Sequence, residues 1–264
     1  MDTDTRSLLR ICRQLSARAI KITKKRNART LLGTNAIGQR SIRADVEIEN
    51  MAIEELARAR IGRVLVTEEK GEVGLGGKGE GVIVCDPLDG SDNFRLGVPF
   101  YCFAISFSRS RDYHDVYFSY VRDLAHWDEF YADEKFAYKN NKRIRASRET
   151  RFERLIVEVD ENKRGHYADL LPLLSRVKDI RRIGANILGL CYLAMGATHL
   201  FIDLRGNLPA VHAPGLRIAQ KAGALVTDRK GKPLKISLDI NEKISFVASA
   251  NRKIHEKALA LMNG

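Results

Sequence analysis

The stretch VIVCDPLDGSDNF, residues 82–94, carries an apolar run directly into a cluster of aspartates. Val82 to Cys85 predict a strand, Pro87 is expected to stop its hydrogen-bond ladder, and Gly90 permits a tight turn. The letters GSDNF are typical of a helix start, whose free N–H groups bind phosphate. An apolar strand that ends in converging carboxylates indicates that a positively charged partner binds there.

A second acidic strand end lies earlier in the chain. The short apolar strand expected within GRVLVTEEKG, residues 62–71, ends in Glu68 and Glu69. Carboxylate oxygens that converge without Cys or His at ligand spacing suit Mg²⁺ better than Zn²⁺. Two such ions beside a phosphate-binding helix start would catalyse phosphoryl transfer to water. The alternative is that Asp86 and Asp89 only cap a turn.

Composition predicts a soluble globular protein. The 264 residues are 44% hydrophobic and 30% charged, enough for one large domain or two modest ones. No apolar run approaches the roughly 20 residues that span a bilayer, and the N-terminus has no secretion-signal pattern. The cysteines are widely spaced, which favours buried free thiols in a reducing cytoplasm over a disulfide pair; they are Cys12, Cys85, Cys102 and Cys191. We therefore expect a cytoplasmic protein without a membrane partner.

The net charge of +12 is unusual. It is compatible with contact to nucleic acid or anionic small molecules, or with the charge-rich surface of a heat-adapted protein. The basic residues are spread along the chain, without a dense block that contains interleaved aromatic residues. A solvated basic surface is therefore favoured over a dedicated nucleic-acid face.

Apolar periodicity predicts alternating helices and strands without internal repeats. The expected helices are at 5–25, 43–61, 165–177, 186–196, 214–223 and 251–263. The expected strands are at 62–71, 81–94, 100–110, 115–123, 154–160, 179–184, 199–206, 224–231 and 245–250, with a hairpin at 128–147 that turns at Asn140 and Asn141. This order predicts an α/β sandwich, with an α+β part over about 1–147 and an α/β part over about 148–264.

The stretch DPLDGSDNF closely resembles the DP-(I/L)-DG-(T/S)-x-NF signature of the inositol monophosphatase family, which includes archaeal enzymes acting on fructose 1,6-bisphosphate. Further similar stretches follow in family order over nearly the whole chain: RAD, TEEKG, FYADEKFAYKNNKRIRAS, RRIGANILGLCYLAMG and KAGALVTDRKGKPL. The resemblance implies a single domain over 1–264, layered as an αβαβα sandwich, and a homodimer. It also implies hydrolysis of inositol monophosphate, fructose 1,6-bisphosphate or a related sugar phosphate.

The resemblance implies a set of metal ligands. Glu68, Asp86 and the backbone carbonyl of Leu88 would hold a first Mg²⁺, or Mn²⁺ or another divalent ion. Asp86 would bridge to a second ion, which Asp89 also holds. In such a site the two ions activate water for attack on phosphorus and neutralise the leaving alkoxide.

The resemblance also implies catalytic and substrate-binding residues. Asp45 matches a helix aspartate that helps to activate water, and Ser91 replaces the family's Thr beside that water. The N–H groups of Gly90 and Ser91 would hold the phosphate. Asp203 corresponds to an acidic residue near the substrate hydroxyls, or it is a strand-end Asp held by its own turn. Arg205 reaches a second phosphate, or it is a surface arginine.

One departure from the family concerns the second metal. The family's second signature, W/V-D-x-A-A-G, supplies a further Asp, whereas this chain has NLPAVHAPGLRIAQKAGA. Alignment from DLRG places His212 at that Asp, and alignment from KAGA places Val211 there, so neither alignment supplies a carboxylate. His212 is either a nitrogen ligand for a softer metal or a residue in an altered turn between Pro209 and Pro214.

Three functions follow from these observations. The first is a Mg²⁺-dependent phosphomonoesterase, which the intact first signature favours. The second is a catalytically weakened paralogue that binds metal and phosphate in a regulatory role, which the missing Asp favours. The third is a nucleic-acid-associated protein, or an enzyme for a nucleotide-type phosphate such as 3′-phosphoadenosine 5′-phosphate.

Overall fold

The larger of the two main sheets in the computed structural model carries the acidic strand ends. The structure describes residues 3–36, 38, 40–76, 81–161 and 166–263. Within these residues the sheet has eight strands in the order β10-β9-β8-β7-β6-β5-β3-β4, and only β3 and β5 pair in parallel. The strands are β3 (Val64–Thr67), β4 (Gly71–Gly74), β5 (Val82–Asp89), β6 (Cys102–Ser108), β7 (Val116–Asp123), β8 (Glu129–Ala132), β9 (Ala137–Lys139) and β10 (Lys142–Ile144).

The second main sheet has five strands in the order β12-β11-β13-β15-β14. Its central strand β13 pairs in parallel with β11 and antiparallel with β15. The strands are β11 (Ile156–Asp160), β12 (Asp179–Arg181), β13 (Leu200–Pro209), β14 (Leu225–Thr227) and β15 (Lys243–Ser249). A separate two-stranded ribbon joins β1 (Leu31–Thr34) to β2 (Arg40–Ile42).

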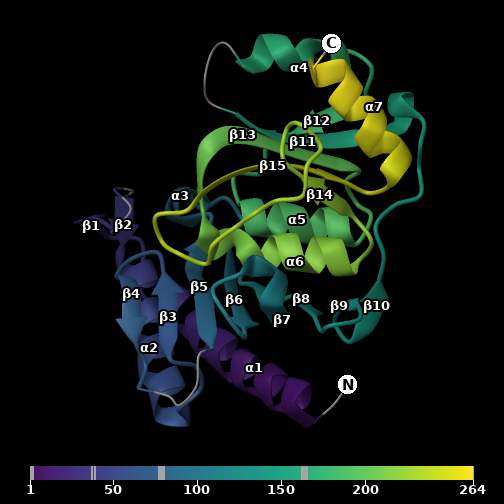
Figure 1. Ribbon diagram of the computed structural model, residues 1–264. Helices are drawn as coiled ribbons and strands as arrows, with labels where there is room; N and C mark the ends of the chain where they lie inside the picture. Colours follow the sequence, from purple (N-terminus) through teal and green to yellow (C-terminus); the bar gives the residue numbers. More distant parts are fainter. Residues whose placement is uncertain (1–2, 37, 39, 77–80, 162–165, 264) are drawn as a thin grey trace.

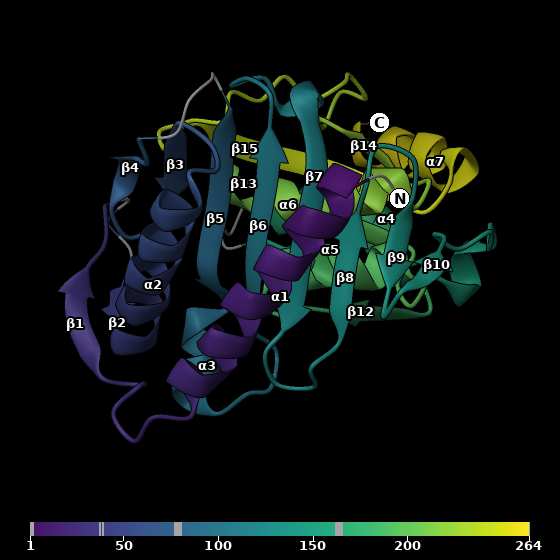
Figure 2. The same cartoon turned by 90° about the horizontal axis from the view of Figure 1, so that it is seen from below.

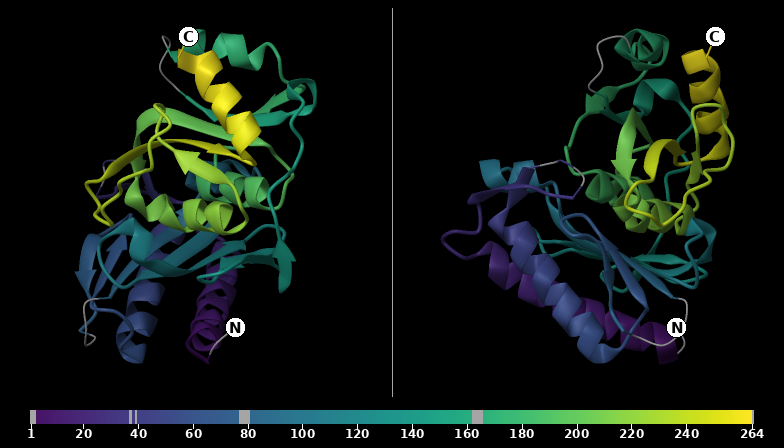
Figure 3. Two further views of the ribbon diagram at one scale, coloured as in Figure 1. Left: turned by 45° about the vertical axis from the view of Figure 1, so that its right-hand side comes forward. Right: turned by 60° about the vertical axis from the view of Figure 1, so that its left-hand side comes forward.

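Helices cover both sheets and also fill the space between them (Figures 1 and 3). The long helices α1 (Thr3–Thr23) and α2 (Arg43–Ala59) lie across the outer face of the eight-stranded sheet (Figure 2). Between the sheets are α5 (Asn186–Ala194) and α6 (Ala213–Lys221), and α4 (His166–Leu174) and α7 (Arg252–Asn263) cover the five-stranded sheet. The predicted layered αβαβα sandwich is confirmed.

The burial of each helix follows its sequence. The letters NILGLCYLA of α5 are apolar on nearly every side, and all but Tyr192 of these residues are buried because a sheet lies on either side. By contrast, α1 packs through one apolar stripe that includes Cys12 and Leu15. The four cysteines are free and buried, as predicted. Among the described residues, no helix combines the length and apolarity needed to cross a membrane.

The structure corrects three local predictions. Strands β1, β2 and β4 were not predicted, because their short, glycine-containing or exposed sequences lack apolar alternation. Pro87 does not stop the ladder of β5; the register shifts between Asp86 and Asp89, and pairing resumes at Asp89 with Cys102. The 128–147 segment forms three strands, although the predicted turn at Asn140 and Asn141 is present, with φ of 48° and 64°.

The remaining predicted elements lie within a few residues of their expected positions. The helix expected at 165–177 is α4, and its first predicted residue lies outside the described part of the chain. The eight-stranded sheet ends at residue 144 and the five-stranded sheet begins at residue 156. The single-domain organisation, with parts over about 1–147 and about 148–264, stays a prediction.

Candidate active site

A polar cleft of about 310 Å³ lies where the end of β5 meets α3 (Ser91–Leu96), the start of α5 and the short turn η3 (Ala210–His212). These segments come from distant parts of the sequence and meet between the two main sheets (Figure 1). Its lining includes the predicted residues Glu68, Asp86, Leu88, Asp89, Gly90, Ser91, Arg205 and His212, together with Asn93, Asp160, Arg182, Gly184, Asn186 and Asn207. Asp45 and Asp203 are buried and are not part of this lining, although Asp203 contacts the lining residues Asn186 and Arg205.

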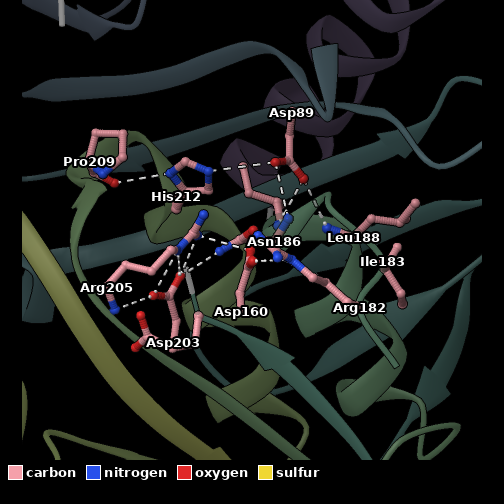
Figure 4. Close-up of polar contacts among 12 residues, drawn as sticks. Asp89, Asp160, Arg182, Ile183, Asn186, Leu188, Asp203, Arg205, Pro209 and His212 are labelled. Atoms are coloured by element: carbon pink, nitrogen blue, oxygen red, sulfur yellow. Dashed lines mark hydrogen bonds and ion pairs between the residues drawn. The ribbon is translucent and has the colours of Figure 1, made fainter. Parts of the chain in front are cut away.

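The bulge in β5 gives its two aspartates different environments. Asp86 Oδ1 accepts the Leu88 N–H at 3.0 Å. Asp86 is 1% exposed, and its Oδ2 has no hydrogen-bond partner among the residues that the structure describes. Asp89 accepts the first N–H groups of α5: its Oδ1 lies 3.2 Å from the nitrogen of Asn186 (Figure 4). Its Oδ2 lies 2.9 Å from the nitrogen of Ile187. Capping of the turn therefore accounts for the hydrogen bond to Asp86 Oδ1, but it gives no reason for burying Oδ2 without a partner.

The acidic side chains of the cleft destabilise one another when all are charged. Burial raises the pKa of Asp86 well above its ordinary value, and the charges of Glu68 and Asp89 raise it further. Burial also raises the pKa of Glu68, to about 7, against the opposing influence of His212. The bare Asp86 Oδ2 and the hard oxygen donors around it fit a bound divalent cation, which would remove this repulsion.

His212 completes this group of ligands. Its Nε2 lies 3.6 Å from Asp89 Oδ1 and 3.8 Å from Asp86 Oδ2, and its Nδ1 lies 3.1 Å from the carbonyl oxygen of Pro209 (Figure 4). Burial lowers the pKa of His212, but its interactions with Asp89 and Glu68 outweigh burial and raise it. Val211 is instead buried in the hydrophobic core. The structure therefore agrees with the alignment from DLRG, which places His212 at the position of the family's Asp.

Behind Glu68, two acidic side chains of α2 face the strand ends. Asp45 Oδ2 accepts the Ile42 N–H at 3.2 Å, which caps the helix. Burial raises the pKa of Asp45 well above its ordinary value, as do Glu68 and Glu69. Glu49, which the sequence analysis missed, accepts the N–H of Glu69 at 3.0 Å and is fully buried. Its position four residues after Asp45, on the same helix face, was the available signal.

At the opposite side of the cleft, Asp203 and Arg205 belong to a partly buried network of ion pairs. Arg205 Nη2 lies 2.6 Å from Asp203 Oδ2 and 3.0 Å from Asp160 Oδ2, and Arg182 Nε donates to Asp160 Oδ1 at 3.1 Å (Figure 4). Asn186 donates to Asp203 Oδ2 at 2.7 Å. The Arg205 side chain is 18% exposed, so its interpretation as a surface arginine was wrong. Asp203 lies within β13 rather than at its end, although it does accept the Arg205 N–H at 3.1 Å.

Asp160, Arg182 and Asn186 were missed by the sequence analysis. Asp160 ends the apolar strand of RLIVEVD, the same pattern that singled out Asp86. Neither Arg182, which directly follows β12, nor Asn186, which begins α5, carries such a signal, because each reaches the cleft only through tertiary packing.

Gly90 connects β5 to α3 where only a glycine fits. Its φ is 80°, and an added Cβ would lie 2.5 Å from the carbonyl oxygen of Phe100 and 2.9 Å from the Cβ of Ala185. The tight turn aligns Gly90 and Ser91 at the edge of the cleft, with Ser91 as the first residue of α3. The expected helix start at GSDNF is thus present.

We expect the metal-free protein to lose stability as the pH rises from about 4.5 to about 7, because the folded-state pKa of Glu68 is raised from 4.5 to about 7. In this range the folded state binds more protons than the unfolded state. The raised pKa values of Asp86 and His212 act in the same direction. Added Mg²⁺ or Mn²⁺ should therefore raise the melting temperature more at pH 7.5 than at pH 5, to be measured by thermal unfolding with metal and with chelator. A metal effect that is absent, or equal at both values, would contradict the assignment of a cation site.

Buried carboxylates that converge at the strand ends fit a site for divalent ions of the kind that phosphatases and other metal-dependent hydrolases use. A family model described as the inositol monophosphatase family matches residues 5–263. The chain belongs to this family, and it is accordingly a phosphoric monoester hydrolase.

Similar proteins match most of the chain. A fructose-1,6-bisphosphatase/inositol-1-monophosphatase of Archaeoglobus fulgidus is 34% identical over 98% of this chain and 99% of its own. A bifunctional NADP phosphatase/NAD kinase of Methanococcus maripaludis is 29% identical over 86% of this chain and 43% of its own.

Solved structures show the same fold. The crystal structure of an inositol monophosphatase-fructose 1,6 bisphosphatase has a TM-score of 0.86 at 25% identity, over 99% of this chain and all of the other. The extragenic suppressor protein suhB from Bartonella henselae has a TM-score of 0.83 at 25% identity, over 97% of this chain and 98% of its own.

Proposed function

We propose that the protein hydrolyses inositol monophosphate, fructose 1,6-bisphosphate or a related sugar phosphate, with Mg²⁺, Mn²⁺ or another divalent ion as cofactor. The observation that carries the proposal is the buried, unpartnered Oδ2 of Asp86 beside Asp89 and Glu68. Buried carboxylates with an unpartnered oxygen lower the stability of the fold unless a bound cation compensates for their charge. Carboxylates destabilised in this way are typical of functional sites.

Two ions would share the acidic residues. Glu68, Asp86 and the Leu88 carbonyl would hold the first, and Asp86, Asp89 and His212 would hold the second. Bound Mg²⁺ or Mn²⁺ would polarise the phosphate and lower the pKa of the attacking water.

The chain's own groups position phosphate and accept a proton. The N–H groups of Gly90 and Ser91, at the start of α3, hold the phosphate oxygens, and the Ser91 hydroxyl orients the attacking water. Glu68, as a ligand of the first ion, would help to activate that water, and a neighbouring carboxylate would accept its proton. Asp45, buried behind Glu68, supports this transfer through its own charge.

The leaving side of the substrate lies against Asp203 and Arg205. Arg205 binds the second phosphate of a bisphosphate. Asp203 is fully buried and already accepts hydrogen bonds from Arg205 and Asn186, so it acts near the substrate hydroxyls by holding these two side chains. Asp160 and Asp203 hold the Arg205 guanidinium in one orientation, so that little rotamer entropy is lost when an anion binds.

Phosphate release from inositol 1-phosphate, fructose 1,6-bisphosphate and NADP, with Mg²⁺ or Mn²⁺, tests the activity and its substrate. We expect Arg205→Gln to raise KM for fructose 1,6-bisphosphate by about tenfold, roughly 1.4 kcal/mol, and to raise KM for inositol 1-phosphate by much less. The matched control is Arg181→Gln, which removes an exposed arginine of β12 that pairs with Asp179 and does not line the cleft. An equal change for both substrates would exclude a second-phosphate role, and complete inactivity of the wild type would favour the regulatory alternative.

We also propose that the protein is a cytoplasmic homodimer. Sedimentation at several concentrations tests the dimer. A nucleic-acid partner is the alternative meaning of the +12 charge, and it predicts RNA binding that weakens steeply as salt is raised.

A further inference from the structure

The imidazole of His212 is oriented by its own backbone so that one nitrogen is free to bind a metal. Nδ1 lies 3.1 Å from the carbonyl oxygen of Pro209, which can only accept a hydrogen bond. Nδ1 therefore carries the proton, and in the neutral ring Nε2 carries the lone pair. Metal-binding histidines in proteins are typically held in this way through their second nitrogen.

The free nitrogen is directed at two carboxylates at a distance that suits a shared ion. The separations of 3.6 Å from Asp89 Oδ1 and 3.8 Å from Asp86 Oδ2 exceed the 2.7–3.2 Å that is typical of a direct hydrogen bond. Two ligand atoms about 2.1 Å from one ion, at a tetrahedral angle, lie about 3.4 Å apart. The three ligand atoms lie within 4.8 Å of one another, which is compact enough for one cation.

A second observation shows that the group is more than an acidic cluster. Asp86 is 1% exposed, and its Oδ2, the oxygen that faces His212, has no hydrogen-bond partner among the described residues. A buried oxygen without a partner carries a desolvation cost that a bound cation would offset.

The backbone also keeps His212 in place. Val211, the neighbouring residue, is anchored in the hydrophobic core between the sheets, and the turn η3 packs against β5. Pro214 lies in the first turn of α6, directly after this segment. The imidazole is thus held by its surroundings on both sides, and the His212 side chain is 10% exposed.

We infer that the cation position formed by Asp86, Asp89 and His212 is a mixed oxygen and nitrogen site that selects Mn²⁺ or a later first-row transition ion over Mg²⁺. Mg²⁺ binds oxygen ligands and gains little from an imidazole, whereas Mn²⁺, Co²⁺ and Zn²⁺ accept one. The inference rests on the proposed function only in that this cleft binds divalent ions.

Pulsed electron paramagnetic resonance of the protein loaded with Mn²⁺ tests the ligand directly. We expect a ¹⁴N coupling from an imidazole in the wild type, and its loss in His212→Asp. The control is His114→Asp, which places the same substitution at an exposed position and should retain the coupling. Because the wild-type signal is decisive by itself, the test does not depend on whether the variant folds.

Calorimetric titration with Mn²⁺ and Mg²⁺ measures the selectivity. We expect the ratio of Mg²⁺ to Mn²⁺ dissociation constants at this position to fall at least tenfold in His212→Asp, mainly because Mg²⁺ binds more tightly. Absence of ¹⁴N coupling in the wild type, or an unchanged ratio in a folded variant, would overturn the inference. A single bound ion without nitrogen coupling would show instead that protonated His212 replaces the second cation.

These results separate the inference from the proposed phosphatase activity. Nitrogen coupling in a protein that hydrolyses no substrate would support the metal site and contradict the enzyme. Hydrolysis of a substrate by a protein that shows no nitrogen coupling would support the enzyme and contradict the proposed nitrogen ligand.

Discussion

Asp86→Asn abolishes phosphatase activity and leaves the protein folded. Asp86 is the residue proposed to contact both ions, and an amide supplies neither the charge nor the second anionic oxygen. The expected loss in kcat is at least about a thousandfold, roughly 4 kcal/mol of transition-state stabilisation. The Asn side-chain oxygen can still accept the Leu88 N–H, so the local turn is retained.

The fold of this variant is checked by its melting temperature. Since burial and neighbouring acids destabilise the charged form of Asp86, the metal-free variant should melt at or above the temperature of the wild type. The metal-induced increase should disappear. Asp92→Asn is the matched control, because Asp92 is 71% exposed and pairs with Arg95 in the same motif. Activity of Asp86→Asn within about threefold of wild type would refute this assignment of the site.

Gly90→Ala disrupts both the stability and the proposed phosphate site. The new methyl would lie 2.5 Å from the carbonyl oxygen of Phe100, which is backbone and cannot rotate away, and the φ of 80° is strained for alanine. We expect the free energy of unfolding to fall by about 2–4 kcal/mol. Displacement of the Gly90 and Ser91 N–H groups should lower kcat/KM at least about a hundredfold.

Gly97→Ala is the control that separates the steric clash of an added Cβ from the strain of a positive φ. Gly97 follows the other end of α3 with φ 83°, but the nearest atom to an added Cβ is the flexible Arg29 Nη1 at 3.8 Å. Only the conformational strain of about 1 kcal/mol is expected there, with activity retained. Denaturant unfolding and steady-state kinetics measure both variants; equal losses in the two would show that the close approach at Gly90 is unimportant.

The apolar periodicity and the turn residues of the sequence predicted most of the helices and strands. The all-round apolar letters of α5 indicated a helix buried between layers, and the paired asparagines Asn140 and Asn141 marked a tight turn that the structure contains. Strands β1, β2 and β4 were missed because exposed, glycine-containing strands bury too little apolar surface to show a pattern. The order of the layers was predicted from the resemblance to the inositol monophosphatase family, because local sequence patterns do not indicate how layers stack.

The sequence by itself determined which strand ends carry acid, because Glu68, Asp86 and Asp89 each follow an apolar run. It could not determine whether His212 or Val211 faces these residues, since that depends on how the chain passes from β13 to α6. Tertiary packing decided it: Val211 is buried in the apolar core, and the turn then directs His212 toward Asp86 and Asp89. Arg205 illustrates the same limit, because its burial results from Asp160 on the neighbouring strand β11, 45 residues earlier in the chain. Long-range packing, rather than local preference, sets such contacts, because burial free energy depends on which distant surfaces meet.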